Sequence, residues 1–283
     1  MFESAYLFLF FYLIITVLFN ENYKIISQNM KSAGALTVLV EFIAAIVSCL
    51  WIPFFEIKFP TDIKIYLLLG LAIIFYTIQN RLATTARSGM EASSYSIIKQ
   101  LSNVFVMVMG FLFLKEELTS QKIIGSILLI GSNIFIFYQK GTWKNNRYLL
   151  LGIFANLCMG IALFLDVNSS NSFNLAFYVF ITLLFPAILV FITERIKIKD
   201  IVNEWKMNSK SLILLTGIGW SFMMITKLKA YQLGEVTKIA PLCSLTVILN
   251  VLFAFIFLKN RKNIVKKLIV SILILIGVFM IKQ

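Results

Sequence analysis

The sequence contains no histidine, and this absence removes several classes of function. Histidine is the commonest metal ligand and the usual general base near neutral pH. Most zinc hydrolases and the serine and cysteine triads need it. The glycine-rich G-x-x-x-x-G-K-[ST] phosphate loop is also missing, so this motif gives no sign of ATP hydrolysis. We therefore expect no catalytic residue, no cofactor and no metal, and the chain is not predicted to be an enzyme.

Cysteine and acidic residues are scarce as well. The three cysteines, Cys49, Cys158 and Cys243, stand far apart within apolar runs, a spacing that indicates neither disulfides nor a metal site. Only 13 Asp and Glu oppose 26 Lys and Arg, which gives a net charge of +13. Most basic residues fall between the apolar runs, where they meet anionic lipid headgroups. We therefore expect the lipid bilayer, and no nucleic acid, as the partner of this charge.

Long apolar runs dominate what is present. Hydrophobic residues make up 60% of the 283-residue chain without counting glycine, whereas soluble domains average about 45–50% with glycine included. A run of about 20 residues can cross a hydrocarbon core of roughly 30 Å. The sequence therefore predicts an all-α integral, multi-pass membrane protein, expected in the cell membrane (plasma or inner). Its ten transmembrane helices are predicted at 4–19, 33–55, 64–80, 92–114, 121–139, 147–165, 173–193, 211–230, 237–258 and 264–281.

The longest connector is "ERIKIKDIVNEWKMNSK", Glu194–Lys210. This connector is predicted to form one amphipathic helix at the membrane interface.

The two halves of the chain resemble each other. "FLFLKEELTSQKIIGSILLIGSNIFIF" (Phe111–Phe137) and "FAFIFLKNRKNIVKKLIVSILILIGVFMI" (Phe253–Ile281) each contain Phe-Leu-Lys, a polar hinge and a span with Ser-Ile-Leu, at an offset of about 144 residues. We therefore predict five-helix repeats at 1–142 and 143–283. Because five is odd, the second repeat must be inverted, a known transporter plan with the site near the midplane between the halves.

At these residues the sequence resembles the drug/metabolite transporter superfamily, in particular its EamA-type ten-helix members. "LGEVTKIAPLCSLTVILNVLFAFIFLKNR" in the second half adds to the likeness, which spans nearly the whole chain. The resemblance implies the ten-helix fold and a transport function. It leaves the substrate open.

The third and fourth spans also resemble the nucleotide-sugar transporter branch, which often has Gln-Asn in one helix and Gln-Leu in the next. Gln79-Asn80 and Gln100-Leu101 match these pairs. The branch has Lys directly after the second pair, where this chain has Ser102. Many EamA proteins have a basic residue in the second helix, where this chain has Glu41.

The fourth span has one polar face. Ser96, Lys99 and Asn103 recur at steps of three and four residues, with Gln100 at the edge of the same face. An intramembrane charge usually marks a pathway or an ion pair. Three interpretations of Lys99 stay open: it lines a cavity, it pairs with Glu41, or its side chain extends to the interface.

Further polar residues extend the candidate substrate site. Arg81 and Lys227 end the third and eighth spans and are approximate counterparts in the repeat. Two such cations beside a midplane cavity suit an anionic substrate, although both could be ordinary interface anchors. Thr246 and Asn250 share a face of the ninth span. With Gln79, Asn80 and the fourth-span residues they complete the predicted substrate site, and Glu41 is the candidate for proton coupling.

The sequence thus predicts a secondary transporter that moves a small polar or anionic metabolite across the membrane by alternating access. One alternative is an exporter of amino acids or of organic cations and drugs on the same fold. An alternative of another class is a non-transporting membrane assembly partner. The expected partners are a small-molecule substrate and the bilayer, and a homodimer is one option for the oligomeric state.

Overall fold

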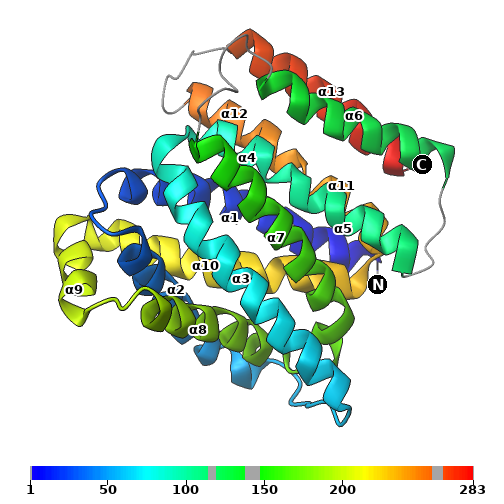
Figure 1. Ribbon diagram of the computed structural model, residues 1–283. Helices are drawn as coiled ribbons and strands as arrows, with labels where there is room; N and C mark the ends of the chain where they lie inside the picture. Colours follow the sequence, from blue (N-terminus) through cyan, green and yellow to red (C-terminus); the bar gives the residue numbers. More distant parts are fainter. Residues whose placement is uncertain (1, 114–118, 138–146, 257–263, 283) are drawn as a thin grey trace.

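A computed structural model describes residues 2–113, 119–137, 147–256 and 264–282, and every regular element in these ranges is helical (Figure 1). The elements in chain order are α1 (Phe2–Gln28), α2 (Ala33–Leu50), η1 (Ile52–Phe54), α3 (Ile63–Gly89), α4 (Ala92–Ile98), α5 (Gln100–Phe113), α6 (Ser120–Phe137), α7 (Arg147–Ser169), η2 (Ser170–Ser172), α8 (Leu175–Thr193), α9 (Ile198–Met207), α10 (Lys210–Leu233), α11 (Val236–Leu242), α12 (Leu245–Ile256) and α13 (Ile264–Lys282).

Within the described residues, 8 helical segments are long and apolar enough to cross a membrane. They correspond to eight of the ten predicted spans. Helices α6 and α13 lie where the fifth and tenth spans were expected, and the count of ten spans stays a prediction. The paired Phe-Leu-Lys motifs fall largely at 114–115 and 257–259, outside the described residues.

Two helices run further than the sequence predicted. The first span was expected to end at residue 19 and the third at residue 80, because polar residues follow. Instead α1 continues to Gln28 and α3 to Gly89. Among the polar residues beyond the predicted ends, Asn20, Thr84 and Arg87 are buried. They face the protein interior, so they do not end the helices.

Two predicted spans are each broken into two helices. The fourth span divides into α4 and α5 at Lys99, and the ninth into α11 and α12 at Cys243 and Ser244. Pro241 lies just before the second break and has no N–H to donate within the helix. Lys99 and Cys243 are 144 residues apart, which is the repeat offset, so the two breaks occur at matching positions.

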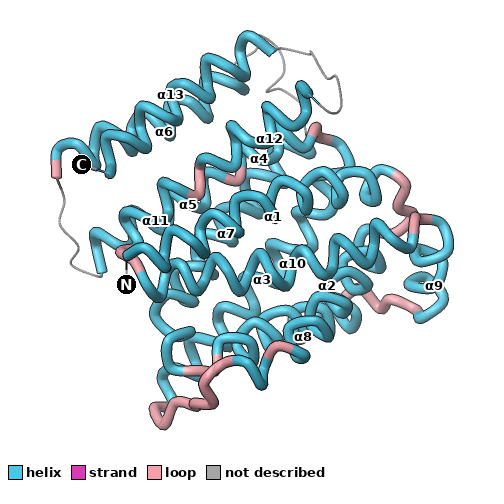
Figure 2. Tube along the Cα trace, turned by 180° about the vertical axis from the view of Figure 1, so that it is seen from behind, coloured by secondary structure: helices cyan, strands magenta, loops and turns pink. Residues whose placement is uncertain are grey.

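The helices of the two halves pack against each other in pairs. The packed pairs include α3 with α7, α1 with α10, α2 with α8, α5 with α11, and α6 with α13, and α5 also packs on α7 and α2 on α10. Figures 1 and 2 show α6 and α13 side by side along one flank of the bundle. Exchanging the halves converts the α1–α10 pair into the α3–α7 pair and the α5–α11 pair into the α4–α12 pair, which is also in contact, and it leaves the α2–α8 and α6–α13 pairs unchanged.

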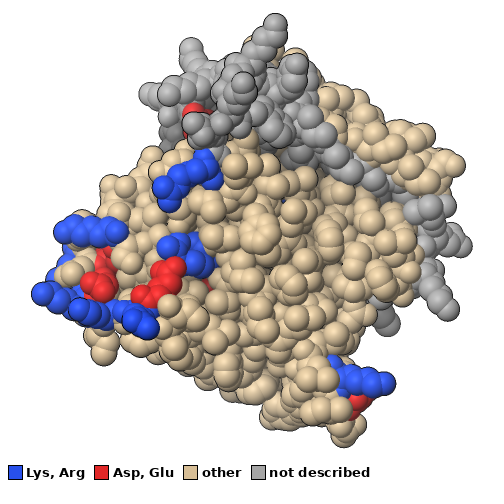
Figure 3. Space-filling view, in the orientation of Figure 1, with Lys and Arg blue, Asp and Glu red and all other residues tan. Residues whose placement is uncertain are grey.

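The surface of the bundle is mostly apolar. On the face shown in Figure 3, charged side chains gather at two ends with an uncharged expanse between them. Large apolar side chains such as Leu7, Phe10 and Leu50 are exposed on the surfaces of their helices. This arrangement is the one expected of helices dissolved in lipid with charged ends in the interfaces.

The predicted interfacial helix is present as α9. The buried carboxylate of Glu204 accepts hydrogen bonds from the backbone N–H groups of Lys31 (2.8 Å) and Ser32 (2.7 Å). These N–H groups lie at the start of α2. Glu204 therefore fixes α9 against α2, while Ile198 and Val202 remain exposed.

Candidate functional site

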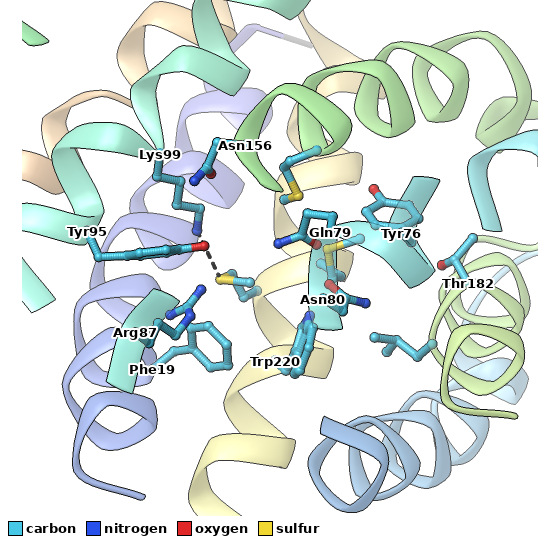
Figure 4. A pocket seen from close by; sticks show the side chains of 14 residues that line it. Phe19, Tyr76, Gln79, Asn80, Arg87, Tyr95, Lys99, Asn156, Thr182 and Trp220 are labelled. Carbon is cyan, nitrogen blue, oxygen red and sulfur yellow. Dashed lines mark hydrogen bonds between the residues drawn. The ribbon is translucent and has the colours of Figure 1, made fainter. Parts of the chain in front are cut away.

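A small cavity lies in the centre of the bundle, between helices from both halves. Its volume is about 20 Å³, room for about one water molecule. Figure 4 shows that its labelled side chains come from several helices and point toward one another. The lining residues are Phe19, Tyr76, Gln79, Asn80, Arg87, Tyr95, Lys99, Asn156, Met159, Thr182, Leu183, Trp220, Met223 and Met224. This set contains two cations and no Asp or Glu.

Arg87 forms one part of the wall. Its guanidinium carbon lies 4.2 Å from the ring centroid of Tyr95, 4.9 Å from that of Tyr23 and 5.2 Å from that of Phe19. Its Nη1 donates to Asn20 Oδ1 at 3.2 Å, and its buried Nε has no hydrogen-bond partner among the residues that the structure describes. The aromatic rings hold the charge in place by cation–π contacts, and one N–H remains available to a ligand.

Lys99 lies at the break between α4 and α5, next to Arg87 and Tyr95 in the cavity wall (Figure 4). Its side chain is buried, and its Nζ lies 3.8 Å from Met223 Sδ. Glu41 instead accepts a hydrogen bond from Asn80. The structure therefore contradicts two interpretations of Lys99: no ion pair joins it to Glu41, and its side chain does not extend to the interface. The third interpretation, that Lys99 lines a cavity, agrees with its position in the cavity wall.

Lys227 brings a third buried cation close to the first two. Its Nζ lies 5.4 Å from the ring centroid of Tyr12, and Lys99 Nζ lies 5.9 Å from the same ring. Lys227 also donates to Asn103 Oδ1 at 3.4 Å, and Asn103 donates to Gln100 Oε1 at 2.8 Å. No carboxylate lies within ion-pair distance of any of the three cations in the described structure.

Neutral polar groups form another part of the wall. Gln79 and Asn80 of α3 line the cavity, and Asn156 of α7 lies near Lys99 in Figure 4. Asn80 is oriented by the carboxyl group of Glu41, whose other oxygen, Oε2, has no hydrogen-bond partner in the described part of the chain. The side-chain amide of Asn156 donates a 2.7 Å hydrogen bond to the carbonyl of Gly152 in its own helix.

The predicted site residues divide into three groups. Lys99, Gln79 and Asn80 line the cavity. Ser96, Gln100, Asn103 and Lys227 are buried beside it without lining it. The remaining three lie elsewhere. Arg81 forms a partly exposed ion pair with Glu194. Thr246 donates to the carbonyl of Cys243 in the break before α12, and Asn250 donates to the carbonyl of Thr246.

The sequence interpretation missed Arg87, Asn156 and the aromatic wall of Phe19, Tyr95 and Trp220. Arg87 was not predicted as a site residue because the third span was expected to end at residue 80, which placed Arg87 in a connector. A signal was nevertheless present. The stretch that follows residue 80 reads Arg-Leu-Ala-Thr-Thr-Ala-Arg, and its composition is compatible with a continuing helix.

These features define a multi-pass helical membrane protein with a small, positively charged cavity in its centre. The model of the EamA-like transporter family matches the chain twice, at residues 4–138 and 146–283, and the chain belongs to this family. It is therefore a membrane transporter, as the resemblance implied.

Solved structures agree with this fold. Among 28 matching chains, one described only as "Crystal structure of protein" has a TM-score of 0.68 and 12% sequence identity. The match covers 98% of this chain and 96% of that chain. At this identity the likeness concerns the fold alone. No curated protein sequence matches the chain.

Proposed function

We propose that the chain is a secondary transporter that moves a small anionic metabolite by alternating access. The observation that carries this proposal is the central cavity, which Arg87 and Lys99 line without any carboxylate among the lining residues. Buried charges are costly unless they are compensated. An anion in the cavity would compensate the charge of both cations and accept a hydrogen bond from the Nε–H group of Arg87.

An inverted repeat is supported by how the helix ends meet. Lys24, near the end of α1, donates to the carbonyl groups of Arg87 (2.8 Å) and Ser88 (3.0 Å) at the end of α3. Tyr148, near the start of α7, packs against Gly89 at the same end of α3. Helix α1 therefore ends where its counterpart α7 begins. Opposite directions of counterpart helices are what an inverted repeat requires.

Alternating access is supported by the size of the cavity and by the two helix breaks. A cavity of about 20 Å³ holds no metabolite, so a substrate enters only when helices move apart. The breaks at Lys99 and at Cys243 and Ser244 interrupt one helix in each half. Such interruptions provide points at which the ends of a span can move separately.

The same wall argues against an organic cation as substrate. Aromatic rings that could bind such a cation already surround Arg87. An amino acid remains the second candidate, because its carboxylate suits Arg87 and Lys99 and the carbonyl oxygen of Gln79 in the cavity wall could accept from its ammonium group.

The test is thermal unfolding of the detergent-purified protein with a ligand panel. The panel contains nucleotides, nucleotide sugars, sugar phosphates, carboxylates, amino acids and organic cations. A ligand at 100 times its dissociation constant stabilises a protein by about 2.7 kcal/mol. We expect anions to shift the transition, and Lys99→Met and Arg87→Gln to abolish the shift. The matched control is Lys238→Met, which removes a part-exposed lysine in a surface ion pair. Stabilisation by cations alone would contradict the proposal.

A further inference from the structure

A second polar cluster lies at one side of the cavity and is not explained by anion binding. The carboxylate of Asp166, on α7, is fully buried. Its Oδ2 accepts from the hydroxyl of Tyr76 on α3, and its Oδ1 accepts from the hydroxyl of Tyr178 on α8 at 2.7 Å. Tyr178 is in turn 2.7 Å from the hydroxyl of Ser169. One carboxylate thus joins three helices.

Tyr76 connects this cluster to the cavity. It lines the cavity wall together with Thr182 and Leu183, and Figure 4 shows Tyr76 and Thr182 on the side away from Arg87 and Lys99. Asp166 lies three residues before the end of α7, which is about 5 Å along the helix axis. The cluster therefore stands between the cavity and the end of the bundle where α7 stops and α8 begins.

We propose that Asp166 is a proton-binding residue of the transport cycle, and that its ionised form closes this end of the cavity. An ionised carboxylate only accepts hydrogen bonds, so it can hold both tyrosine hydroxyls at once. A proton taken up from water adds to one carboxylate oxygen and forms an O–H group. The hydrogen bond that this oxygen accepts from its tyrosine then weakens, and the helix of that tyrosine, α3 or α8, can separate from α7. Loss of the proton to water restores the closed arrangement.

The charged surroundings of Asp166 suit a residue that changes protonation state. Tyr76 faces it from α3 and Tyr178 from α8, while Lys227 and Tyr231 of α10 interact with it electrostatically. Helices α4 and α5, which also pack on α7, have no Asp, Glu, Lys or Arg; Lys99 lies between them. Two hydroxyl donors and one nearby ammonium group can stabilise the anion, and within the described ranges Asp166 forms no ion pair.

Asp166 fits this role better than Glu41, the candidate from the sequence. Glu41 accepts one hydrogen bond, from the Asn80 amide, and its other oxygen has no partner. It bridges only α2 and α3. Asp166 has both oxygens engaged and connects three helices, so a change in its charge alters more contacts.

The test measures access to the cavity without any substrate. Thr182→Cys places a thiol in the cavity wall, in a background in which Cys49, Cys158 and Cys243 are replaced. Thr182 hydrogen-bonds only to carbonyl groups of its own helix, so this change is mild. The readout is the rate of alkylation by a membrane-impermeant maleimide at alkaline and at mildly acidic pH. Each rate is divided by the rate of the same thiol in the Asp166→Asn protein, which removes the pH dependence of the thiol itself.

We expect acidification to raise the normalised rate by about fivefold or more, the lower range of typical coupling between sites. Asp166→Asn should label quickly at both pH values, because a neutral amide imitates the protonated acid. Tyr178→Phe, which keeps the carboxylate but removes one donor, should label faster than the parent at alkaline pH. Glu41→Gln should keep the pH response of the parent.

Three outcomes would overturn the proposal: a normalised rate that does not change with pH, a Tyr178→Phe protein that labels as slowly as the parent, or loss of the pH response in Glu41→Gln alone. The Tyr178→Phe comparison decides the matter even if Asp166→Asn does not fold. The inference rests on the proposed alternating access but not on the charge of the substrate. A ligand panel without any anion response would refute the anionic substrate and leave the labelling result intact.

Discussion

Replacing Lys99 by Met should make the ligand-free protein more stable. On membrane insertion scales, a lysine at the centre of a span costs about 2.5–3.5 kcal/mol. Its compensation in the structure is small: the Nζ lies 3.8 Å from a thioether sulfur and 5.9 Å from the ring centroid of Tyr12. A cation–π contact at this limiting distance contributes about 1 kcal/mol. Because Lys99 lies nearer one end of the apolar segment Ser94–Phe113 than its centre, we expect Lys99→Met to gain up to about 2 kcal/mol in the free energy of unfolding.

The sign of this change separates a binding residue from a structural one. If a carboxylate neutralised Lys99, removing the lysine would leave that acid uncompensated and would cost about 3–5 kcal/mol. The assay is reversible unfolding in mixed micelles, with the fraction folded followed by tryptophan fluorescence. The same protein should lose its response to anionic ligands. Gain of stability together with loss of ligand response is the expected signature of a site that is not optimised for stability.

Lys24→Met is the matched control, because it makes the same substitution at a lysine with a structural role. The Lys24 ammonium group donates to two carbonyl oxygens at the end of α3. Hydrogen bonds to charged groups contribute about 1.5–3 kcal/mol each, so Lys24→Met should lose stability. If Lys99→Met lost as much stability as Lys24→Met, the interpretation of Lys99 as an uncompensated cavity residue would be wrong.

Three further predictions concern contacts outside the cavity wall. Gly217→Ala should destabilise the protein by about 1–3 kcal/mol, because its new Cβ would lie 2.5 Å from Ile43 Cγ2. Gly70→Ala, whose new Cβ would have no atom within 4 Å, should stabilise the protein by up to about 1 kcal/mol in the same unfolding assay. Glu204→Ala should cost roughly 3 kcal/mol and speed hydrogen exchange in α9, and Glu204→Gln should retain most of the stability; equal losses would show that the carboxyl group does not anchor α9. Arg81→Gln should change stability by less than about 1 kcal/mol and leave the ligand response intact, and loss of that response would return Arg81 to the site.

The contrast between Arg81 and Arg87 shows what the sequence could and could not predict. Both are arginines near the end of an apolar run, and the composition of the run gave a helix correctly. The two positions are six residues apart, which on an α-helix is about 9 Å along the axis and about 120° around it. Only one of them can therefore face the cavity, and the answer depends on where α3 ends and how it packs. Arg81 instead faces Glu194, a residue 113 positions away.

The fourth span shows the opposite case. Its polar face was visible as a three- and four-residue repeat, and the structure places that face in the protein interior, as its period predicts. The break at Lys99 was not predicted, because no proline or glycine marks it; the sequence does mark the matching break, with Pro241. Periodicity thus identifies which side of a helix is polar. Local backbone breaks without Pro or Gly depend on contacts from distant helices, and one sequence does not reveal them.

Charge and closure of the cavity are coupled, and this coupling bears on the transport cycle. When the cavity closes, Arg87, Lys99 and Lys227 lose water and come under each other's field without a neutralising carboxylate within ion-pair distance in the described structure. An anion in the cavity lowers the free energy of the closed state more than that of an open, hydrated one. By linkage, a ligand that binds the closed state more tightly shifts the population toward it. The anion thus favours the closed intermediate, through which the cavity passes when its access changes from one side of the membrane to the other. On this reasoning exchange of anions should be faster than net flux, and equal rates of the two in proteoliposomes would show that the empty carrier closes as readily as the loaded one.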